Sequence, residues 1–290
     1  MAQPRVLAVL GQPIEHSLSP LMHNTAIQAL GLAYVYVAFE VAPADLAEAV
    51  AGLRALGVRG YNLTIPHKER VLPYLQELTE EARLIGAVNT VRLDGQRLIG
   101  HNTDGVGLLA ALRRDGGIDP AGKRCVVLGA GGAARAVVVQ LALAGAAEIL
   151  IANRTPERAA ALASHVAANV GGVALAALPL DGERLRQPLA RADLVINATS
   201  VGMGDDAASP LPADVLSDRH FVCDLIYRPP QTRLLRQARQ RGARVLNGLG
   251  MLLYQGAAAF QWWTGEPFPV EQVRRALLEH LAAGDEEARS

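Results

Sequence analysis

Strand-like and helix-like segments alternate along almost the whole of this 290-residue chain. Residues 6–10, 34–41 and 58–63 are short runs rich in β-branched and other apolar side chains, and helical patterns at 21–30 and 44–56 separate them. This alternation is typical of α/β proteins, in which a helix crosses over between neighbouring parallel strands. The sequence therefore predicts an α/β fold.

The pattern resumes after residue 86 and continues to the C-terminal region. Two short strands are expected at 88–93 and 97–99, around Asp94-Gly95, a dipeptide favoured in hairpin turns. A helix is expected to follow Asp104, and the turn-rich residues 115–120 predict a linker. A length of 290 residues favours two domains. Further strands are expected at 124–128, 149–152, 194–197, 221–225 and 244–246, and closing helices at 251–263 and 270–283.

Charge and hydropathy exclude several classes of protein. The chain has 28 basic and 28 acidic residues, so a net charge of zero gives no chain-wide attraction to nucleic acid or acidic membranes. Its mean hydropathy is +0.17, but no uninterrupted apolar stretch of about 18 residues occurs, so we expect no membrane span. The apolar run near the N-terminus ends at Gly11-Gln12-Pro13, and this run is too short for a signal peptide. We predict a soluble, cytoplasmic protein.

Cysteine and histidine positions predict neither disulfides nor a metal site. Cys125 and Cys223 lie far apart within apolar runs, which suits a reducing compartment. The seven histidines are scattered. His16 and His23 are a pair that could meet, but they lack the spacing of metal-binding motifs, and we expect no metal.

A glycine-rich turn follows the strand expected at 124–128. Residues 129–134 read Gly-Ala-Gly-Gly-Ala-Ala, a G-x-G-x-x-A pattern between a strand and a helix, which is the context of dinucleotide binding. Gly129 permits the tight turn, Gly131 lets the backbone approach a pyrophosphate, and Ala134 allows close packing of helix on strand. Free N–H groups at the start of the helix suit phosphates. The alternative is an ordinary tight turn.

The end of the next strand distinguishes the two nicotinamide cofactors. NAD-binding units normally carry Asp or Glu there, which accepts a hydrogen bond from the ribose 2′-hydroxyl. Here the strand ends in Asn153-Arg154-Thr155, followed by Pro156 and Arg158. A carboxylate would repel a 2′-phosphate, whereas the Arg154 guanidinium can form charge-assisted hydrogen bonds to it. The sequence predicts NADP, and the alternative is a helix N-cap beside a solvated arginine.

The rarity of lysine makes Lys68 a candidate for proton chemistry. Of 28 basic residues only Lys68 and Lys123 are lysine, so 26 are arginine. A guanidinium stays protonated, whereas an ammonium group can exchange a proton. Lys68 closes the segment 62–68 that follows a strand, where an exposed lysine at a helix entry is the alternative. Asp104 reads either as a helix N-cap or as the partner of Lys68 in a proton-transfer pair.

Two serines precede the first expected helix. Ser19 followed by Pro20 reads as an N-cap with proline at the first helical position. This interpretation leaves Ser17 without a structural role. Because open α/β sheets bind ligands at the carboxyl ends of their strands, Ser17 is a candidate binding residue.

Taken together, these segments resemble the shikimate dehydrogenase family. Nine motifs occur in family order, and they cover nearly the whole chain. One such motif would be weak, but nine in order are highly specific. They lie at residues 17–20, 62–68, 86–90, 102–105, 129–134, 153–155, 197–203, 224–227 and 247–255.

The resemblance implies reversible, NADPH-dependent reduction of 3-dehydroshikimate to shikimate in aromatic amino acid biosynthesis. It also implies an α/β substrate-binding domain at 1–104, a Rossmann-type NADP-binding domain at 105–247, and helices at 248–290 that return to the first domain, with a cleft between the domains. The expected partner is the small-molecule substrate, with no nucleic acid and no membrane. We expect a monomer or a homodimer.

The functional residues of the family carry over by motif. In the family, two serines and a tyrosine hold the carboxylate end of the substrate, while a lysine and an aspartate contact the hydroxyl next to the reacting carbon. The implied substrate-binding residues are Ser17, Ser19, Thr64, Lys68, Asn89, Asp104, Tyr227 and Gln255, of which Lys68 and Asp104 are catalytic. The implied NADP-binding residues are Gly129, Ala130, Gly131, Gly132, Ala133, Asn153, Arg154, Thr155, Arg158, Leu225, Gly248 and Glu80.

The sequence departs from the family pattern at two places. Leu63 replaces the usual valine, and Arg228 with Pro229-Pro230 follows the tyrosine motif where asparagine is expected.

The alternative functions are a quinate or amino-shikimate dehydrogenase and a non-catalytic NADP-sensing protein. Lys123 and the arginines between 233 and 244 read as solvated residues, the latter with an anionic-partner patch as the alternative.

Overall fold

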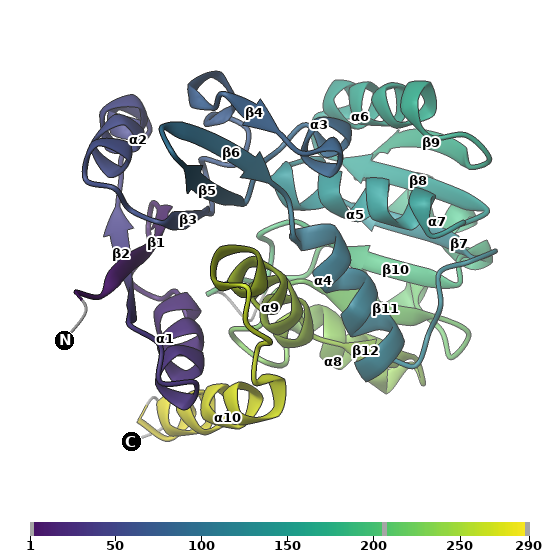
Figure 1. The fold of residues 1–290 in the computed structure, drawn as a ribbon. Coiled ribbons are helices and arrows are strands. Elements are labelled where there is room, and N and C mark those ends of the chain that lie inside the picture. The colour runs from purple at the N-terminus through teal and green to yellow at the C-terminus, as the bar shows by residue number, and fades with distance from the viewer. Residues whose placement is uncertain (1–2, 205–207, 288–290) are drawn as a thin grey trace. The chain divides into compact units, whose positions relative to one another are not determined.

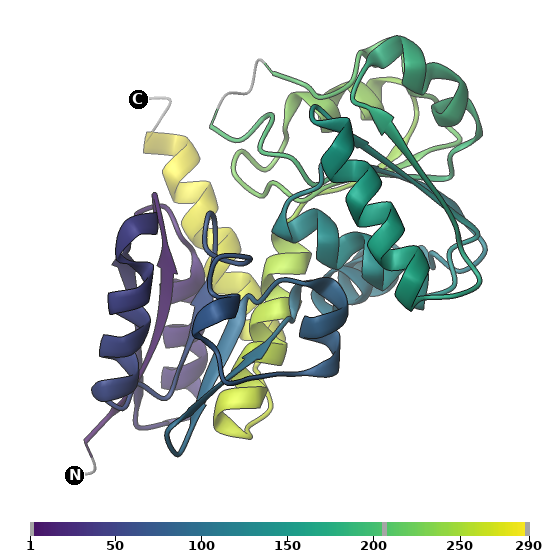
Figure 2. The same ribbon diagram turned by 90° about the horizontal axis from the view of Figure 1, so that it is seen from above.

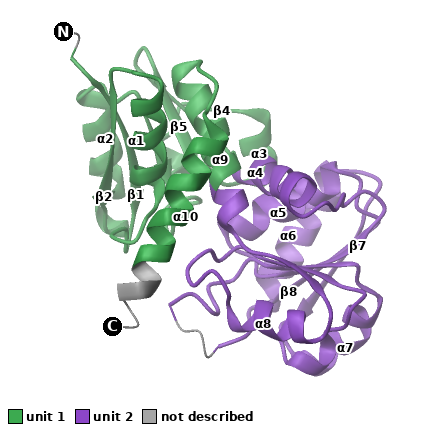
Figure 3. Cartoon of the chain, turned by 90° about the horizontal axis from the view of Figure 1, so that it is seen from below, with its two compact units in different colours: residues 1–103, 253–290 green, residues 104–252 purple. Residues whose placement is uncertain are grey.

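The computed structural model describes residues 3–204 and 208–287 and divides into two compact units (Figures 1 and 3). One unit consists of residues 1–103 and 253–290, and the other of residues 104–252. Each contains a six-stranded sheet with helices packed on it, which confirms the predicted α/β fold class. Within the described ranges, none of the helices is both long and apolar enough to span a lipid bilayer.

The first unit contains a mixed sheet with strand order β2-β1-β3-β5-β6-β4. Strand β1 pairs in parallel with β2 and β3, whereas β5 runs antiparallel to both of its neighbours. The strands are β1 (Arg5–Gly11), β2 (Tyr34–Glu40), β3 (Gly60–Leu63), β4 (Glu77–Leu78), β5 (Thr90–Asp94) and β6 (Arg97–His101). The helices are α1 (Ser19–Ala29), α2 (Leu46–Ala55), α3 (Glu80–Ile85), α9 (Leu249–Thr264, of which residues 249–252 are in the second unit) and α10 (Val270–Glu287), with 3₁₀ turns at Pro43–Asp45 and Leu72–Tyr74.

The reversal of strand order around β1 places α1 and α2 on opposite faces of this sheet (Figure 2). The chain passes from β1 through α1 to β2, and then in the opposite direction from β2 through α2 to β3. Because both crossovers are right-handed, the two helices must lie on opposite faces. The face under α2 forms the core, where Leu46 and Val50 pack with Leu10 and Tyr61 of the sheet.

Most of α9, from Leu253 onward, and the whole of α10 belong to the first unit, where α10 packs beside α1 (Figure 1). Trp263, at the end of α9, is 1% exposed, and its indole N–H donates to the carbonyl of Val91 across 2.9 Å. Gly60 lies directly under this ring, because a Cβ at Gly60 would overlap the indole. The contact fixes α9 against the sheet.

The second unit contains an entirely parallel sheet with strand order β12-β11-β10-β7-β8-β9. Two halves wind outward from the β7–β10 pair, which is the doubly wound Rossmann topology. The strands are β7 (Arg124–Leu128), β8 (Glu148–Asn153), β9 (Ala174–Pro179), β10 (Leu194–Asn197), β11 (Phe221–Asp224) and β12 (Arg244–Leu246). The helices are α4 (Asp104–Ala110), α5 (Gly132–Leu143), α6 (Pro156–Asn169), α7 (Gly182–Arg191) and α8 (Arg233–Gln240), with a π-helical turn at Ala111–Asp115 and a 3₁₀ turn at Ala213–Val215.

Several local features differ from the sequence prediction. The turn-rich residues 115–120 lie inside the second unit, where the Ile118 N–H donates to the Leu112 carbonyl. The expected hairpin forms, but Asp94 belongs to its first strand, where it pairs with Arg97. The two loop residues are therefore Gly95, at φ 60°, and Gln96.

The start of the first helix also differs. Ser19 is the first residue of α1 and not its N-cap, a position that Leu18 occupies without a side-chain hydrogen bond. The Ser17 hydroxyl instead accepts a hydrogen bond from the Ser19 N–H across 3.3 Å. Ser17, which the N-cap interpretation left without a structural role, therefore caps the turn.

Candidate active site

Polar residues of the first unit follow the carboxyl ends of its central parallel strands. Leu10 of β1 pairs with Leu63 of β3, and the Thr64 N–H donates to the Leu10 carbonyl across 2.9 Å. Gly11 and Thr64 are therefore neighbours, and a Cβ at Gly11 would overlap the Thr64 side chain. The close approach of these strand ends brings the Ser17 and Thr64 segments to the same edge of the sheet.

Asn89 is the centre of a buried hydrogen-bond network in this unit. Its carboxamide Nδ2 donates to Thr103 Oγ1 (3.0 Å) and to Gln255 Oε1 (3.2 Å). Its Oδ1 accepts from the Thr103 N–H (2.8 Å) and from the Thr90 hydroxyl (2.8 Å). Asn89 is 2% and Gln255 is 8% exposed. The structure thus brings together two of the expected substrate-binding residues from distant parts of the chain.

The network extends through residues that the sequence analysis did not place in the site. Asn62 Nδ2 donates to Thr90 Oγ1 (3.1 Å), and the Tyr36 hydroxyl donates to Asn62 Oδ1 (2.7 Å). Ser19 is hydrogen-bonded to Tyr36, and burial raises the pKa of this phenol well above its ordinary value. A polar Asn62 inside an otherwise apolar strand is the one feature of the sequence that could have indicated this extension of the network. Tyr36 and Thr90 resemble ordinary strand residues.

Lys68 and Asp104 occupy different surroundings. Lys68 is half-buried, and its backbone carbonyl accepts a hydrogen bond from the Val88 N–H across 2.8 Å. Asp104 is 4% exposed and begins α4 in the second unit, directly after Thr103. A half-buried ammonium and a buried carboxylate are groups suited to proton transfer and orientation.

The glycine-rich turn of the second unit has the geometry expected of a dinucleotide site. Gly129 has φ 113°, and a Cβ there would lie 2.9 Å from the Ala198 carbonyl oxygen, so the fold itself requires glycine. Gly131 differs, because its φ is −91° and a Cβ would meet nothing within 4 Å. The open space over Gly131, at the N-terminus of α5, fits a pyrophosphate that approaches the backbone closely.

Arg154 lies beside this turn at the same edge of the sheet. Leu128 pairs with Ala152, and the Gly129 N–H donates to the Ala152 carbonyl across 2.7 Å. Arg154 follows β8 and is exposed. Thr155 is the backbone N-cap of α6 without a side-chain cap, and Arg158 is exposed in the first turn. Thr155 therefore has the backbone geometry of a helix N-cap, as the alternative interpretation of this segment expected. The Arg154 guanidinium nevertheless remains accessible to a ligand.

Another part of this edge is built around a buried carboxylate. Asp224 accepts hydrogen bonds from Asn197 Nδ2 (3.0 Å), the Ile226 N–H (3.1 Å) and the Thr232 hydroxyl (2.7 Å). Burial raises the pKa of Asp224 to about 6, and these hydrogen bonds oppose the shift. The carboxylate thus anchors the segment that continues to Tyr227, which is half-buried.

Leu225 and Gly248 are brought into direct contact. The Gly248 N–H donates to the Ile226 carbonyl across 3.1 Å, and a Cβ at Gly248 would overlap the backbone of Leu225. Glu80, in contrast, is an exposed residue in the first turn of α3 in the first unit, where a carboxylate also favours the helix dipole.

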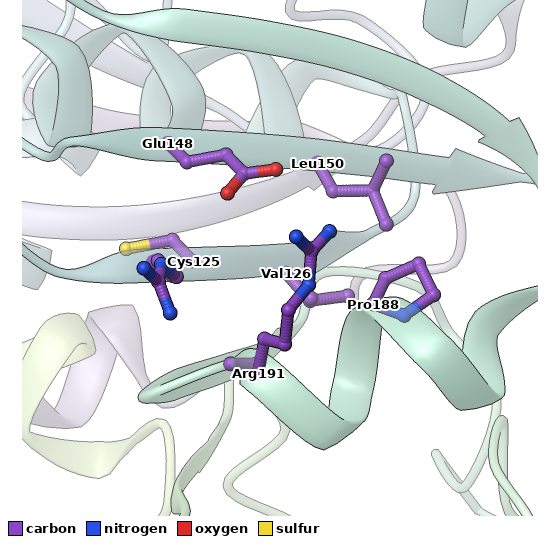
Figure 4. A pocket seen from close by; sticks show the side chains of 8 residues that line it. Cys125, Val126, Glu148, Leu150, Pro188 and Arg191 are labelled. Atoms are coloured by element: carbon purple, nitrogen blue, oxygen red, sulfur yellow. The ribbon is translucent and has the colours of Figure 1, made fainter.

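A surface pocket lies elsewhere in the second unit, where β7 and β8 begin (Figure 4). Arg124, Cys125 and Glu148 contribute to its lining, together with Pro188 and Arg191 of α7. The glycine-rich turn follows the opposite ends of these strands, so the pocket is separate from the dinucleotide edge. Across residues 3–204 and 208–287, no group of three or more His, Cys, Asp or Glu side chains is placed to hold a metal ion.

Known proteins are similar to this chain along nearly its whole length. Residues 9–91 match the model of the shikimate dehydrogenase substrate binding domain, residues 112–203 match that of shikimate / quinate 5-dehydrogenase, and residues 248–278 match that of the shikimate 5′-dehydrogenase C-terminal domain. A shikimate dehydrogenase (NADP⁺) from Methanopyrus kandleri is 51% identical over 282 residues, which cover 97% of each chain.

Solved structures extend the similarity to three dimensions. Shikimate 5-dehydrogenase from Thermus thermophilus, in complex with NADP(H) and shikimate, has a TM-score of 0.83 at 44% identity and covers 94% of this chain and 98% of its own. Quinate dehydrogenase from Corynebacterium glutamicum, in complex with NAD, has a TM-score of 0.87 at 33% identity, with coverages of 96% and 100%. By sequence and by fold, this chain belongs to the shikimate dehydrogenase family.

Proposed function

We propose that this chain catalyses the reversible, NADP-dependent interconversion of 3-dehydroshikimate and shikimate, a step of aromatic amino acid biosynthesis. The observation that carries the proposal is the buried network in which Asn89 meets Gln255. In a member of this family, such a network would fix the segments that carry the substrate-binding side chains. Ser17, Ser19 and Tyr227 would hold the substrate carboxylate, with Thr64 beside its ring.

Lys68 and Asp104 are the candidates for the proton step. The Lys68 ammonium would give its proton to the oxygen of the keto group as that oxygen gains negative charge, while the Asp104 carboxylate orients the ammonium. Two hydrogen bonds support the pairing. The Lys68 carbonyl accepts from the Val88 N–H, and the Thr103 N–H, immediately before Asp104, donates to Asn89 Oδ1. The Lys68 backbone and the residue before Asp104 are thus both hydrogen-bonded to the segment 88–89.

NADPH, when bound, supplies the hydride for this reaction. Residues 129–133 would hold its pyrophosphate, since Gly131 leaves open space at the start of α5. Arg154 and Arg158 would bind the 2′-phosphate, with Asn153 and Thr155 beside the adenosine ribose. Leu225 and Gly248 would line the site further along the sheet edge, and the family resemblance also assigns Glu80 to the cofactor.

Domain roles, compartment and assembly complete the proposal. Residues 1–104 would bind the substrate and residues 105–247 the cofactor, with 248–290 supporting the substrate domain. Cys125 and Cys223 are both buried free thiols, which suits the reducing cytoplasm. We propose a cytoplasmic monomer or homodimer, which sedimentation equilibrium would distinguish.

A direct assay tests the proposed reaction. The purified chain is mixed with shikimate and NADP, and the absorbance of NADPH is followed while 3-dehydroshikimate is quantified by chromatography. We expect equal amounts of the two products. NADP binding without turnover would instead support the non-catalytic NADP-sensing alternative and would contradict the proposal.

Quinate and amino-shikimate are the alternative substrates within the family. The similarity to a quinate dehydrogenase crystallised with NAD makes quinate the one to compare first. The exposed Arg154 at the end of β8 favours NADP, because a permanent positive charge complements a 2′-phosphate.

A further inference from the structure

We infer that His67 is a positioning residue for Lys68: its buried imidazole fixes the segment that carries the catalytic lysine. The inference rests on the proposed function, because it assigns a supporting residue to the proposed proton donor. His67 is fully buried, and its Nε2 lies 2.8 Å from the carbonyl oxygen of Val41. A carbonyl can only accept a hydrogen bond, so Nε2 carries the proton and donates it.

The bond connects the loops that follow β2 and β3, the two strands that flank β1 in the sheet. Val41 comes directly after β2, and His67 comes four residues after the end of β3. The backbone of the same segment is also attached to β1, because Thr64 N–H donates to the Leu10 carbonyl. Beyond His67, the Lys68 carbonyl accepts from the Val88 N–H across 2.8 Å. The imidazole therefore adds a side-chain anchor immediately before the lysine.

The other ring nitrogen explains why a neutral donor suits this position. His67 Nδ1 is buried without a hydrogen-bond partner. A proton there would be a buried donor without an acceptor, so the tautomer with its proton on Nε2 fits the site. The imidazole thus makes one buried hydrogen bond, and that bond anchors the segment.

Loss of this anchor should affect the chemical step more than substrate binding. The unpaired Val41 carbonyl would favour movement of the segment, and proton transfer depends steeply on the position of the donor. Ser17 and Asn89 belong to other segments of the chain, so substrate affinity should change less. The expected signature is a fall in kcat with a nearly constant KM.

The test compares His67→Met with His67→Gln, two side chains of similar size of which only glutamine can replace the Nε2–H donor. We expect His67→Met to lower kcat by about 10- to 100-fold with KM for shikimate within about threefold, and His67→Gln to restore kcat to within about threefold of wild type. His67→Met with kcat within about twofold of wild type, or His67→Gln impaired as strongly as His67→Met, would overturn the inference.

His220→Met is the matched control. His220 is 2% exposed and directly precedes β11, and its Nε2 lies 2.8 Å from the Leu189 carbonyl, so the variant loses a buried bond of the same kind, together with the bond from the Ser217 N–H to Nδ1. We expect it to lower Tm by a similar amount but to keep kcat within about twofold of wild type. An equal loss of kcat in His67→Met and His220→Met would reveal a general effect of destabilisation and would overturn the inference.

Two further measurements keep the outcomes distinct. Lys68→Ala is measured in the same assay to separate the two proposals. An inactive wild type refutes the proposed function. An active wild type with an impaired Lys68→Ala and an unaffected His67→Met refutes only the role of His67. If His67→Met does not fold, His67→Asn replaces it, because its shorter amide cannot reach Val41. We then expect low kcat in His67→Asn and near-normal kcat in His67→Gln, and equal values would overturn the inference.

Discussion

The side-chain amide of Asn89 donates to Gln255 Oε1 across 3.2 Å, although 166 residues separate the two in sequence. Both side chains are buried in the first unit. Because Gln255 lies on α9, the return of the C-terminal region to the first unit completes the network around Asn89. Helix α9 therefore contributes a side chain to this buried network and also packs on the sheet.

Asn89→Ala should destabilise the fold and weaken substrate binding. The change leaves the Thr103 N–H and Gln255 Oε1 without their buried partner, which costs about 1–3 kcal/mol of unfolding free energy. Urea denaturation measures this loss, and the KM for shikimate should rise. In Asn169→Ala, which removes an exposed side-chain bond to the His165 carbonyl, we expect a loss under about 0.5 kcal/mol. Equal losses in the two variants would contradict the proposed role of the network.

Lys68→Ala should lower kcat by about 10²–10⁴ with a smaller effect on KM, since it removes the proposed proton donor. Lys68→Arg should not restore kcat, because a guanidinium keeps its proton. Steady-state kinetics with shikimate measure both. The other lysine gives a control: Lys123→Ala should leave kcat unchanged. A normal kcat in Lys68→Ala would remove Lys68 from the chemistry.

Arg154→Ala should weaken NADP binding by roughly 10- to 100-fold, because a hydrogen bond to a charged phosphate is worth about 1.5–3 kcal/mol. NAD has no 2′-phosphate, so its Kd should change by less than about twofold. Titration calorimetry with both cofactors provides the comparison. Arg184→Ala, at an exposed arginine paired with Asp181, should alter neither Kd. Equal losses for NADP and NAD in Arg154→Ala would contradict the 2′-phosphate assignment.

Asp224→Asn should change how stability depends on pH. Burial raises the pKa of Asp224 from 3.8 to about 6, so between these values the folded protein holds a proton that the unfolded chain has released. The contribution of this carboxyl to stability is therefore present at low pH and lost as pH rises through about 6. The stability of wild type relative to Asp224→Asn should fall by up to about 3 kcal/mol from pH 4 to pH 7.

Urea unfolding of both proteins at each pH measures that difference, since the other titrating groups cancel. A difference that is constant from pH 4 to pH 7 would mean that the Asp224 carboxyl has no raised pKa.

The sequence predicted most elements because their signals were local. The strand expected at 124–128 and the glycine turn after it are found at those positions, since a buried apolar strand followed by G-x-G-x-x-A has few other solutions. Strand β9 was missed, because Ala174–Pro179 consists of alanine, leucine and proline, which have no β-branched side chains, and it is an edge strand.

The framework of the site was less predictable. Tyr36 resembled a core aromatic residue, and only the fold shows its hydroxyl on Asn62 Oδ1. The contact of Asn89 with Gln255 depends on the path of α9, which no local pattern specifies. Resemblance could name such residues, but their mutual contacts are consequences of tertiary structure.

The substrate and cofactor preference of the wild-type chain is measured as kcat/KM for shikimate and quinate, each with NADP and with NAD, on one preparation. We expect the shikimate–NADP pair to have the highest value, by about tenfold or more over either quinate pair. A higher kcat/KM for quinate, or for NAD over NADP with shikimate, would contradict this expectation.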